Sequence, residues 1–284
     1  MIKSSTGEVC SPNDDIKALD LHGTNALRAK LLQIQADSGT GEEALLAEAE
    51  IAVGVEQAAE QEKQAAQAEQ EKQAEKAAKK ALSDFRSYLA QSTGKAAQAL
   101  PEDSELEYPY NPVTQQCEIT RLDGAPILLD ISNSGLSGEL PLPPQLMVAG
   151  LYCRLNQLTS LPEVLPASLT RLECYDNQLT TLPEQLPPSL TELHCSDNRL
   201  TSLPEVLPAS LTKLYCFNNQ LTSLPELPTS LTGLWCNNNL LAKLPELPTR
   251  LINLDCSDNP DLASNPAAQA ALQELRARGV WVRS

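Results

Sequence analysis

The sequence predicts an α+β protein in which a long Ala-rich α-helix precedes a repeat solenoid, with a parallel β-sheet on the concave face and an extended, polyproline-like convex side. Two observations lead to this fold class. Residues 42–90 are rich in Ala, Glu, Gln and Lys and contain no Pro. Further along, six Cys recur at intervals of 21, 21, 21, 20 and 20 residues, each followed three positions later by Asn. A fixed period of this kind is typical of stacked repeats.

The composition limits the classes of partner. The chain has 284 residues, a formal net charge of -16 and 4% aromatic residues. Phosphate binding depends on clustered Lys and Arg, so this charge disfavours nucleic acid or an anionic membrane surface as the partner. The sequence has no stretch of about eighteen apolar residues, and its first eight residues lack the apolar core of a Sec signal. We expect a protein partner, no nucleic acid and no membrane span.

The N-terminal third is expected to hold a flexible segment and one helix. Residues 1–41 mix polar residues, Gly and Pro, which predicts little fixed structure. Residues 42–90 are strong helix formers and should build one long helix. Between Glu56 and Lys80 the only apolar residue is Ala, so coiled-coil heptads would place charged residues where Leu or Ile is needed. We expect a solvated helix, and weak self-association through it stays open.

The last turns of this helix differ from the rest. Leu82, Phe85, Tyr88 and Leu89 form an apolar stripe at helical spacing, so this end should pack against another surface. The following residues, 91–116, contain Gly and several Pro and are predicted to be a linker.

Residues 117–131 are expected to form an N-capping hairpin. The two apolar runs 117–121 and 125–131 flank Asp123-Gly124, a strong local signal for a two-residue hairpin turn. Such a hairpin would cover the first open edge of the solenoid.

The repeats occupy residues 129–262. The unit reads L-x-C-x-x-N-x-L-T-x-L-P-E-x-L-P-x-S-L-T-x, and a degenerate copy with Ile131 at the Cys position opens the array. Leu and Cys alternate along a short strand and should both point inward, and only stacking can bury that face. The Asn amide should satisfy backbone groups of adjacent coils, because each buried polar group left unpaired costs about 1–3 kcal/mol. The paired Pro favour an extended convex side. These columns define a leucine-rich-repeat solenoid.

Residues 263–284 are predicted to cap the far end. Asn265-Pro266 is typical of a helix start, and the Arg and Gly residues at 276–279 are typical of a helix end. Residues 267–278 should therefore be a capping helix, and residues 280–282 a final extended piece that shields the last coil.

The repeat text is specific enough to show a resemblance. Residues 218–231, NNQLTSLPELPTSL, closely resemble the LPX-type leucine-rich repeats of bacterial type III secreted effectors, the YopM and IpaH groups. The resemblance covers residues 129–262. It implies repeats that bind host proteins, in scaffolds or in members that carry a C-terminal ubiquitin-ligase domain. It also implies a protein made in the bacterial cytoplasm and exported into a host cell. This chain departs from the pattern in having Cys where those members usually have Val or another aliphatic residue.

We expect no catalytic, metal or cofactor site, and therefore a chain that is not an enzyme. The ligase of the resembled effectors uses a Cys-x-Asp motif, which 195–197 and 256–258 match in letters. Both Cys belong to the inward column, whereas a nucleophile must be exposed. Their spacing lacks the close pairs of zinc sites, and parallel side-chain vectors disfavour disulfides. His22 and His194 suggest no catalytic triad.

The candidate binding residues lie directly before and directly after each Cys, where strand alternation points side chains away from the core. These positions differ between copies far more than the scaffold columns do, and they hold five of the ten aromatic residues of the chain. Exposed aromatics on a rigid sheet are typical of interface hot spots. Cross-strand stacking that stiffens the sheet is the alternative role for the same rings. The predicted partner-binding set is Tyr152, Arg154, Glu173, Tyr175, His194, Tyr215, Phe217, Trp235, Asn237 and Asp255.

Three functions remain open at this point. The first is a non-catalytic protein-binding scaffold that uses the concave face, as a secreted effector engaging a host protein if the resemblance extends so far. The second is the substrate-recognition part of a ubiquitin-ligase-type effector. The third is a self-associating structural protein. Acidic residues around the face favour a partner that offers Lys or Arg.

Overall fold

The computed structural model describes residues 2–3, 9–10, 33, 42–91 and 98–284. The chain divides into two units, Met1–Gln70 and Glu71–Ser284. In the first unit, strands β1 (Ile2–Lys3) and β2 (Val9–Cys10) pair antiparallel. The predicted flexible segment, residues 1–41, otherwise lies almost entirely outside the described residues.

Helix α3 (Glu42–Ala90) has the predicted bounds; it begins in the first unit and ends in the second. Every side chain from residue 57 to residue 70 is exposed, as expected for a stretch without an apolar stripe. Further on, Lys79 pairs with Glu75 and Lys80 with Asp84 one turn apart. None of the described helices has the length and hydropathy needed to cross a bilayer. Self-association through the helix stays a prediction.

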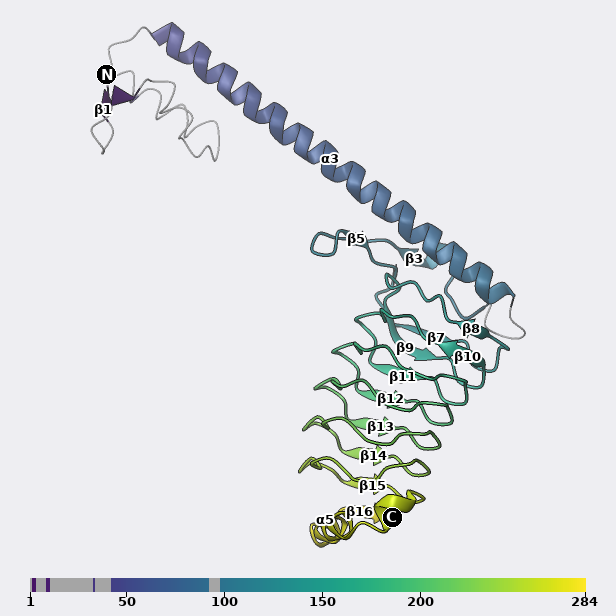
Figure 1. Ribbon diagram of the computed structural model, residues 1–284. Helices are drawn as coiled ribbons and strands as arrows, with labels where there is room; N and C mark the ends of the chain where they lie inside the picture. Colours follow the sequence, from purple (N-terminus) through teal and green to yellow (C-terminus); the bar gives the residue numbers. More distant parts are fainter. Residues whose placement is uncertain (1, 4–8, 11–32, 34–41, 92–97) are drawn as a thin grey trace. The chain divides into compact units, whose positions relative to one another are not determined.

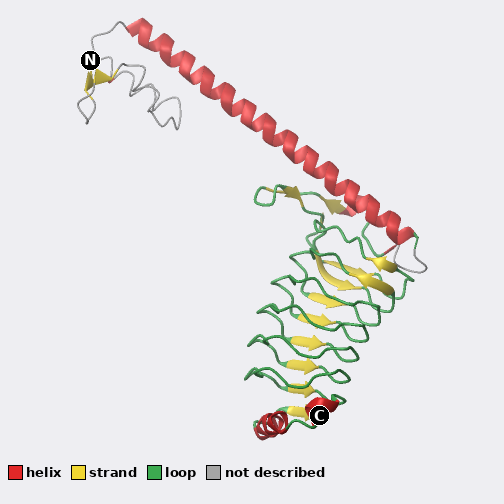
Figure 2. Cartoon of the chain, in the orientation of Figure 1, coloured by secondary structure: helices red, strands yellow, loops and turns green. Residues whose placement is uncertain are grey.

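The second unit is a solenoid built on one parallel sheet, which Figure 1 shows as a stack of arrows and Figure 2 as a column of yellow strands. Equivalent residues of successive coils lie opposite each other, so Leu172 pairs with Leu151 on one side and Leu193 on the other. In spatial order the eight strands are β7 (Ile127–Asp130), β9 (Val148–Tyr152), β11 (Arg171–Glu173), β12 (Glu192–His194), β13 (Lys213–Tyr215), β14 (Gly233–Trp235), β15 (Asn253–Asp255) and β16 (Trp281–Arg283).

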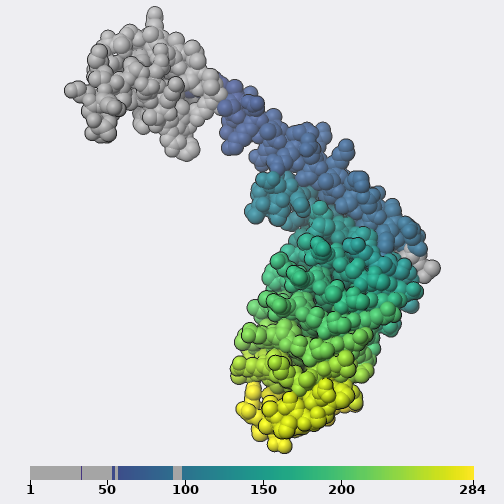
Figure 3. Space-filling model, in the orientation of Figure 1, coloured from purple at the N-terminus to yellow at the C-terminus, as the bar shows by residue number. Residues whose placement is uncertain are grey.

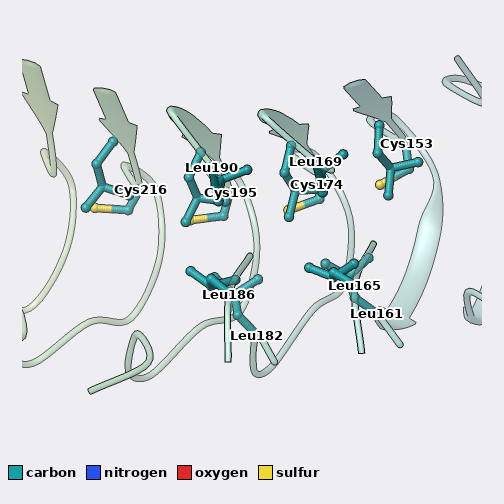
Figure 4. Packing of buried hydrophobic residues seen from close by; sticks show 14 of the residues in the cluster. Cys153, Leu161, Leu165, Leu169, Cys174, Leu182, Leu186, Leu190, Cys195 and Cys216 are labelled. Atoms are coloured by element: carbon teal, nitrogen blue, oxygen red, sulfur yellow. The ribbon is translucent and has the colours of Figure 1, made fainter. Parts of the chain in front are cut away.

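The predicted inward column is confirmed. Figure 4 shows the Cys side chains of successive coils, with their Leu neighbours, projecting from the strands toward the convex segments. All six repeat Cys are free and at most 2% exposed. Because burial disfavours the thiolate, the pKa of Cys153 and that of Cys195 rise to about 12. These thiols pack as apolar groups and are unsuited to nucleophilic chemistry.

The recurrent Asn forms the predicted bridge between coils. Asn198 donates from Nδ2 to the carbonyls of Cys174, Cys195 and Ser196 at 3.0, 3.2 and 3.0 Å. Its Oδ1 accepts the backbone N–H of Leu179 at 2.9 Å. The same pattern recurs in every coil from Asn156 onward; the Asn at 156, 177, 219, 239 and 259 each donate to the Cys carbonyl of their own coil. Each amide therefore satisfies two successive coils.

A left-handed residue precedes each of these Asn. At this position φ lies between 52° and 56°, a region that side chains other than Asn, Asp and Gly adopt at a cost. Five coils place Asp or Asn at this position, but the first full coil has Leu155. The residues concerned are Leu155, Asp176, Asp197, Asn218, Asn238 and Asp258.

The convex segments are almost entirely loops, drawn green in Figure 2. A short parallel pair, β8 (Ser137–Glu139) with β10 (Gln157–Ser160), is the exception in the first two coils. After Leu221 the repeat loses one convex residue, the one equivalent to the exposed Val206. The strand register is unchanged, since Leu214 still pairs with Leu234.

The N-terminal cap differs from the prediction in two respects. Strands β5 (Gln116–Cys117) and β6 (Thr120–Arg121) pair with β4 (Tyr110–Asn111) and β3 (Leu106–Glu107), whereas β7 pairs in parallel with β9. The expected hairpin over 117–131 is therefore wrong, although Gly124 does make a left-handed turn at φ 67°. Residues 98–116 are part of the cap rather than a linker. They include the 3-10 turn η2 (Asp103–Glu105) and strands β3 and β4. Residues 92–97 are not described.

The apolar end of α3 completes this cap. Ala78, Leu82, Phe85 and Leu89 are buried in one core cluster with the repeat leucines. Arg86 holds the following segment by donating to Asp103 at 2.7 Å and to the carbonyl of Pro101 at 2.5 Å. The predicted docking of the helix end is thus an apolar lid on the first coils.

The C-terminal cap follows the prediction. Helix α4 (Pro260–Ala263) leads to α5 (Pro266–Ala277), whose N-cap Asn265 accepts the N–H of Ala267 at 3.0 Å. Leu272 and Leu275 of α5 are buried, and β16 adds the last strand to the sheet.

Replacing Asn198 with Ala should lower the free energy of unfolding by about 2 kcal/mol or more, because the buried N–H of Leu179 loses its partner and the carbonyls of Cys174 and Cys195 each keep only one of their two amide donors. Urea denaturation followed by tryptophan fluorescence measures the change. The matched control, Asn237→Ala on the outward face, should shift stability by about 0.5 kcal/mol or less. Equal effects of the two substitutions would contradict the bridging role.

Replacing Leu155 with Asn should raise stability by about 1 kcal/mol, because Asn tolerates the left-handed region better than Leu. The reverse change, Asp258→Leu at the equivalent position, should lower it by a similar amount. Thermal unfolding measures both. A Leu155→Asn variant less stable than the parent would show that Leu155 contributes packing that outweighs its backbone cost.

Candidate functional site

Three columns of outward side chains cover the concave face of the sheet. Besides the two predicted columns, the residue two positions before the first of them also faces outward in each strand, and this column was missed from the sequence. Applying the same alternation two residues earlier would have found it. The column consists of Leu128, Gly150, Arg171, Glu192, Lys213, Gly233, Asn253 and Trp281.

Four of the five predicted aromatic residues come together with His194 as a ladder across four coils. The rings of Tyr175 and His194 stack with centroids 4.3 Å apart, and those of His194 and Tyr215 lie 4.9 Å apart. Tyr215 and Trp235 stack at 4.2 Å with an interplanar angle of 10°. Phe217 lies 5.8 Å from His194. We call these five side chains the aromatic ladder; each is half-buried.

Two glycines make room for rings to lie along the sheet. A Cβ on Gly233 would fall 2.5 Å from the Trp235 ring, and one on Gly150 would fall 3.0 Å from the Tyr152 ring. Distances below about 3.0 Å are not tolerated between such atoms, so Gly233 is required for the position of Trp235. Tyr152 lies one coil before the ladder and accepts a hydrogen bond from Arg171 at 3.2 Å.

Ion pairs flank the ladder. Arg154 donates to Glu173 at 2.6 Å, and its guanidinium also lies over the Tyr175 ring. Glu192 forms ion pairs with Arg171 at 3.3 Å and with Lys213 at 3.8 Å. The charged members of the face are thus held in fixed orientations by neighbouring coils.

Asp255 departs from the expected set. It is 5% exposed, accepts hydrogen bonds from the backbone N–H and hydroxyl of Ser257, and pairs with Arg283 at 3.6 Å. The physical reason is β16, which adds Arg283 beside β15 and covers this end. Asn237 remains half-exposed beside Trp235. We therefore leave Asp255 out of the candidate surface.

The centre of the face holds two buried polar atoms for which the described residues provide no hydrogen-bond partner. They are Nε2 of His194 and Oγ of Ser196, on the same strand end. Burial among the rings lowers the pKa of His194, although Glu173, Asp197 and Glu192 act in the opposite direction. His194 is therefore kept neutral over a wider pH range than a free histidine.

Neither a metal-type cluster nor an exposed repeat thiol occurs at this face among the described residues. In the part of the chain that the structure describes, no group of three His, Cys, Asp or Glu is placed to hold a metal ion. The Cys of both Cys-x-Asp sequences, Cys195 and Cys256, are buried, and burial raises the pKa of Cys256 to about 11.

Replacing His194 with Phe should remove a pH-dependent part of the stability. An unfolded histidine takes up its proton near pH 6.5, roughly, and the folded one only at lower pH. Below that pH the unfolded state binds more protons than the folded state. The contribution of neutral His194 to stability, present at neutral pH, is therefore lost as the pH falls through the pKa of His194 in the folded state. When the pH is lowered from about 7.5 to about 5, the parent should therefore lose more stability than the His194→Phe variant, as measured by thermal unfolding. A difference that does not change with pH would contradict this.

A family model described as leucine-rich repeats (2 copies) matches residues 188–229 and 209–249. No curated protein sequence matches the chain. Among solved structures, the chain is similar to YopM from Yersinia enterocolitica WA-314, at 45% identity and a TM-score of 0.44 over 46% of this chain and 28% of that one.

Two further structures are similar over comparable stretches. YopM from Yersinia pestis, described as a leucine-rich effector protein, is 37% identical with a TM-score of 0.41, over 46% of this chain and 42% of that one. A Shigella effector leucine-rich-repeat domain is 30% identical with a TM-score of 0.40, over 55% of this chain and 79% of that one. The chain thus spans less than half the length of either YopM structure. Repeat sequence, strand register and family match agree: this is a leucine-rich-repeat protein whose repeats resemble those of bacterial effectors.

Proposed function

We propose that the chain is a non-catalytic scaffold that binds a protein partner on its concave face. The observation that carries the proposal is the aromatic ladder. Large rings held half-exposed on a rigid sheet offer apolar area with little side-chain entropy left to lose on binding. The contact set we propose is Tyr152, Arg154, Glu173, Tyr175, His194, Tyr215, Phe217, Trp235 and Asn237.

Stacking within the sheet and binding of a partner are compatible uses of the same rings. In the ladder the ring faces of Tyr215 and Trp235 contact each other, and their edges remain for the partner. Stacking fixes each ring before binding, which reduces the ordering cost of association. Figure 3 shows the surface of the coils in sequence order, from teal at the first coils to yellow at the C-terminal end.

The partner should combine an apolar surface with basic side chains. The chain carries a net charge of -16, and the ladder is bordered by Glu173, Glu192 and Asp197. Opposite charge on the partner would increase the association rate and disfavour acidic competitors. The resemblance of the repeat text to that of secreted effectors supports a host-cell protein as this partner, reached after export from a bacterium.

A catalytic role as a ubiquitin ligase has less support. Cys195 and Cys256, the nucleophiles that such an activity would require, are buried with raised pKa values. We therefore propose recognition without catalysis for this chain.

The double variant Tyr215→Ala, Trp235→Ala should lose partner capture by tenfold or more, roughly, because two adjacent anchors are removed. Lysates of candidate host cells, passed over immobilised full-length protein and analysed by mass spectrometry, provide the measurement. The control is Val164→Ser with Val206→Ser, which changes two exposed apolar residues of the convex side. Proteins captured equally by the double variant and the parent would contradict concave-face binding.

A further inference from the structure

The column directly after each Cys has a gap in the middle of the aromatic ladder. Three successive coils place Tyr175, Ser196 and Phe217 at this position. Adjacent strands lie about 4.8 Å apart, so the strands of the two rings are separated by roughly 9.6 Å with only a serine between them. A flat group in contact with a ring on each side needs roughly 7 to 8 Å. The three side chains therefore outline a slot of the right width for one planar group.

The imidazole of His194 occupies this slot in the present structure. Its ring centroid lies 4.3 Å from that of Tyr175 and 5.8 Å from that of Phe217. Ser196, at the base of the slot, is 0% exposed, whereas the equivalent Tyr175 and Phe217 are half-exposed. The histidine ring and its aromatic neighbours thus cover the serine.

This arrangement leaves hydrogen-bonding capacity unused. Neither Oγ of Ser196 nor Nε2 of His194 has a partner among the described residues, although both atoms are buried. Buried polar atoms without partners are uncommon and costly in folded proteins. Moving the imidazole out of the slot would return Nε2 to solvent and open the serine hydroxyl to a bound group. Both unpaired atoms would then be satisfied.

Charge identifies the kind of group that fits. Asp197 follows Ser196 directly and forms no ion pair in the described part of the chain; its carboxylate accepts only the amide of Asn218. Glu173 and Glu192 are nearby but already bound by Arg154, Arg171 and Lys213. A cation entering the slot would therefore meet one uncompensated carboxylate, whereas an anion would be repelled.

We propose that the slot between Tyr175 and Phe217 receives the guanidinium of an arginine of the partner protein, which displaces the His194 imidazole and hydrogen-bonds Ser196. A guanidinium is planar, stacks on aromatic rings and carries several donors, so it matches the walls, the base and the charge of the slot. Lysine has the charge without the flat shape. This inference rests on the proposed function, because the arginine belongs to the bound protein.

The test is a titration of the full chain with N-acetyl-arginine amide, followed by NMR shifts of the Tyr175 and Phe217 ring protons. Saturable binding should be weaker for N-acetyl-lysine amide, which lacks the planar group, and for N-acetyl-citrulline amide, which is planar and uncharged. Equal affinity for all three probes, or no saturable shift with the arginine probe, overturns the slot.

Three variants separate a slot from a surface contact. His194→Ala should tighten arginine binding about fivefold, because no side chain has to be displaced, whereas a histidine that simply contacted the ligand would give weaker binding. Ser196→Ala should weaken binding about tenfold through the lost hydrogen bond. Ser196→Phe should abolish it by filling the slot with the residue already present at position 217. Val206→Phe, at an exposed position of the convex side, should leave arginine binding unchanged.

These outcomes distinguish the two proposals. Parent-like arginine affinity in Ser196→Phe, or weaker affinity in His194→Ala, overturns the slot even if partner capture still depends on Tyr215 and Trp235. Arginine binding that follows the expected order supports the slot. Capture of proteins that does not depend on Tyr215 and Trp235 contradicts the concave-face scaffold, whatever the result for arginine.

Discussion

The amide of the buried Asn is the interaction on which the rest of the solenoid depends. Each coil turns sharply after its Cys, and that turn leaves backbone carbonyls pointing into the interior. The Asn of the same coil satisfies them, and also bonds the Cys carbonyl of the coil before. Since unpaired carbonyls in an apolar core are costly, the turn and the stacking distance are fixed together. The Leu and Cys side chains then pack as the apolar core inside a backbone whose position the Asn hydrogen bonds fix.

The outward residues of the strands can therefore vary without a loss of the fold. Because the fold is maintained by the inward column and the Asn amides, the positions beside each Cys can carry Arg, Tyr, Ser, Phe or Asn without a change in strand register. The packing of the core therefore does not dictate which residues stand on this face. Where two large rings are neighbours they stack, and where charges are neighbours they pair, as Arg154 and Glu173 do.

The parts of the fold that sequence reasoning predicted are those encoded within one repeat length. The inward Cys and the bridging Asn act on residues within about one coil, so a repeated pattern identifies them, and Asn265 caps the helix that directly follows it, so a local helix-start signal identifies it. The N-terminal cap was not predictable in this way. Its strands pair Leu106 with Arg121 across an intervening hairpin, and neither residue belongs to a periodic pattern. The Asp123-Gly124 turn formed, but stacking on β9 offered the next strand a better partner than the hairpin did.

The candidate surface was predictable in its membership and less so in its geometry. Strand alternation places Tyr215 and Trp235 outward, yet their stacking depends on Gly233, whose missing side chain has meaning only beside a particular ring. Asp255 was misjudged because β16 is not a copy of the repeat, and its Arg283 has no equivalent in earlier coils. The repeat pattern alone therefore does not predict the exposure of residues that lie next to a non-repeated cap.

The single-residue shortening of the later coils has a practical consequence. Omitting the residue equivalent to Val206 changes the length of the convex segment and leaves the strands aligned, so backbone length on that side is decoupled from the sheet. An epitope, a fluorophore-bearing peptide or a surface-attachment tag inserted next to Val206 would report on the protein while its opposite side stays free to engage other molecules.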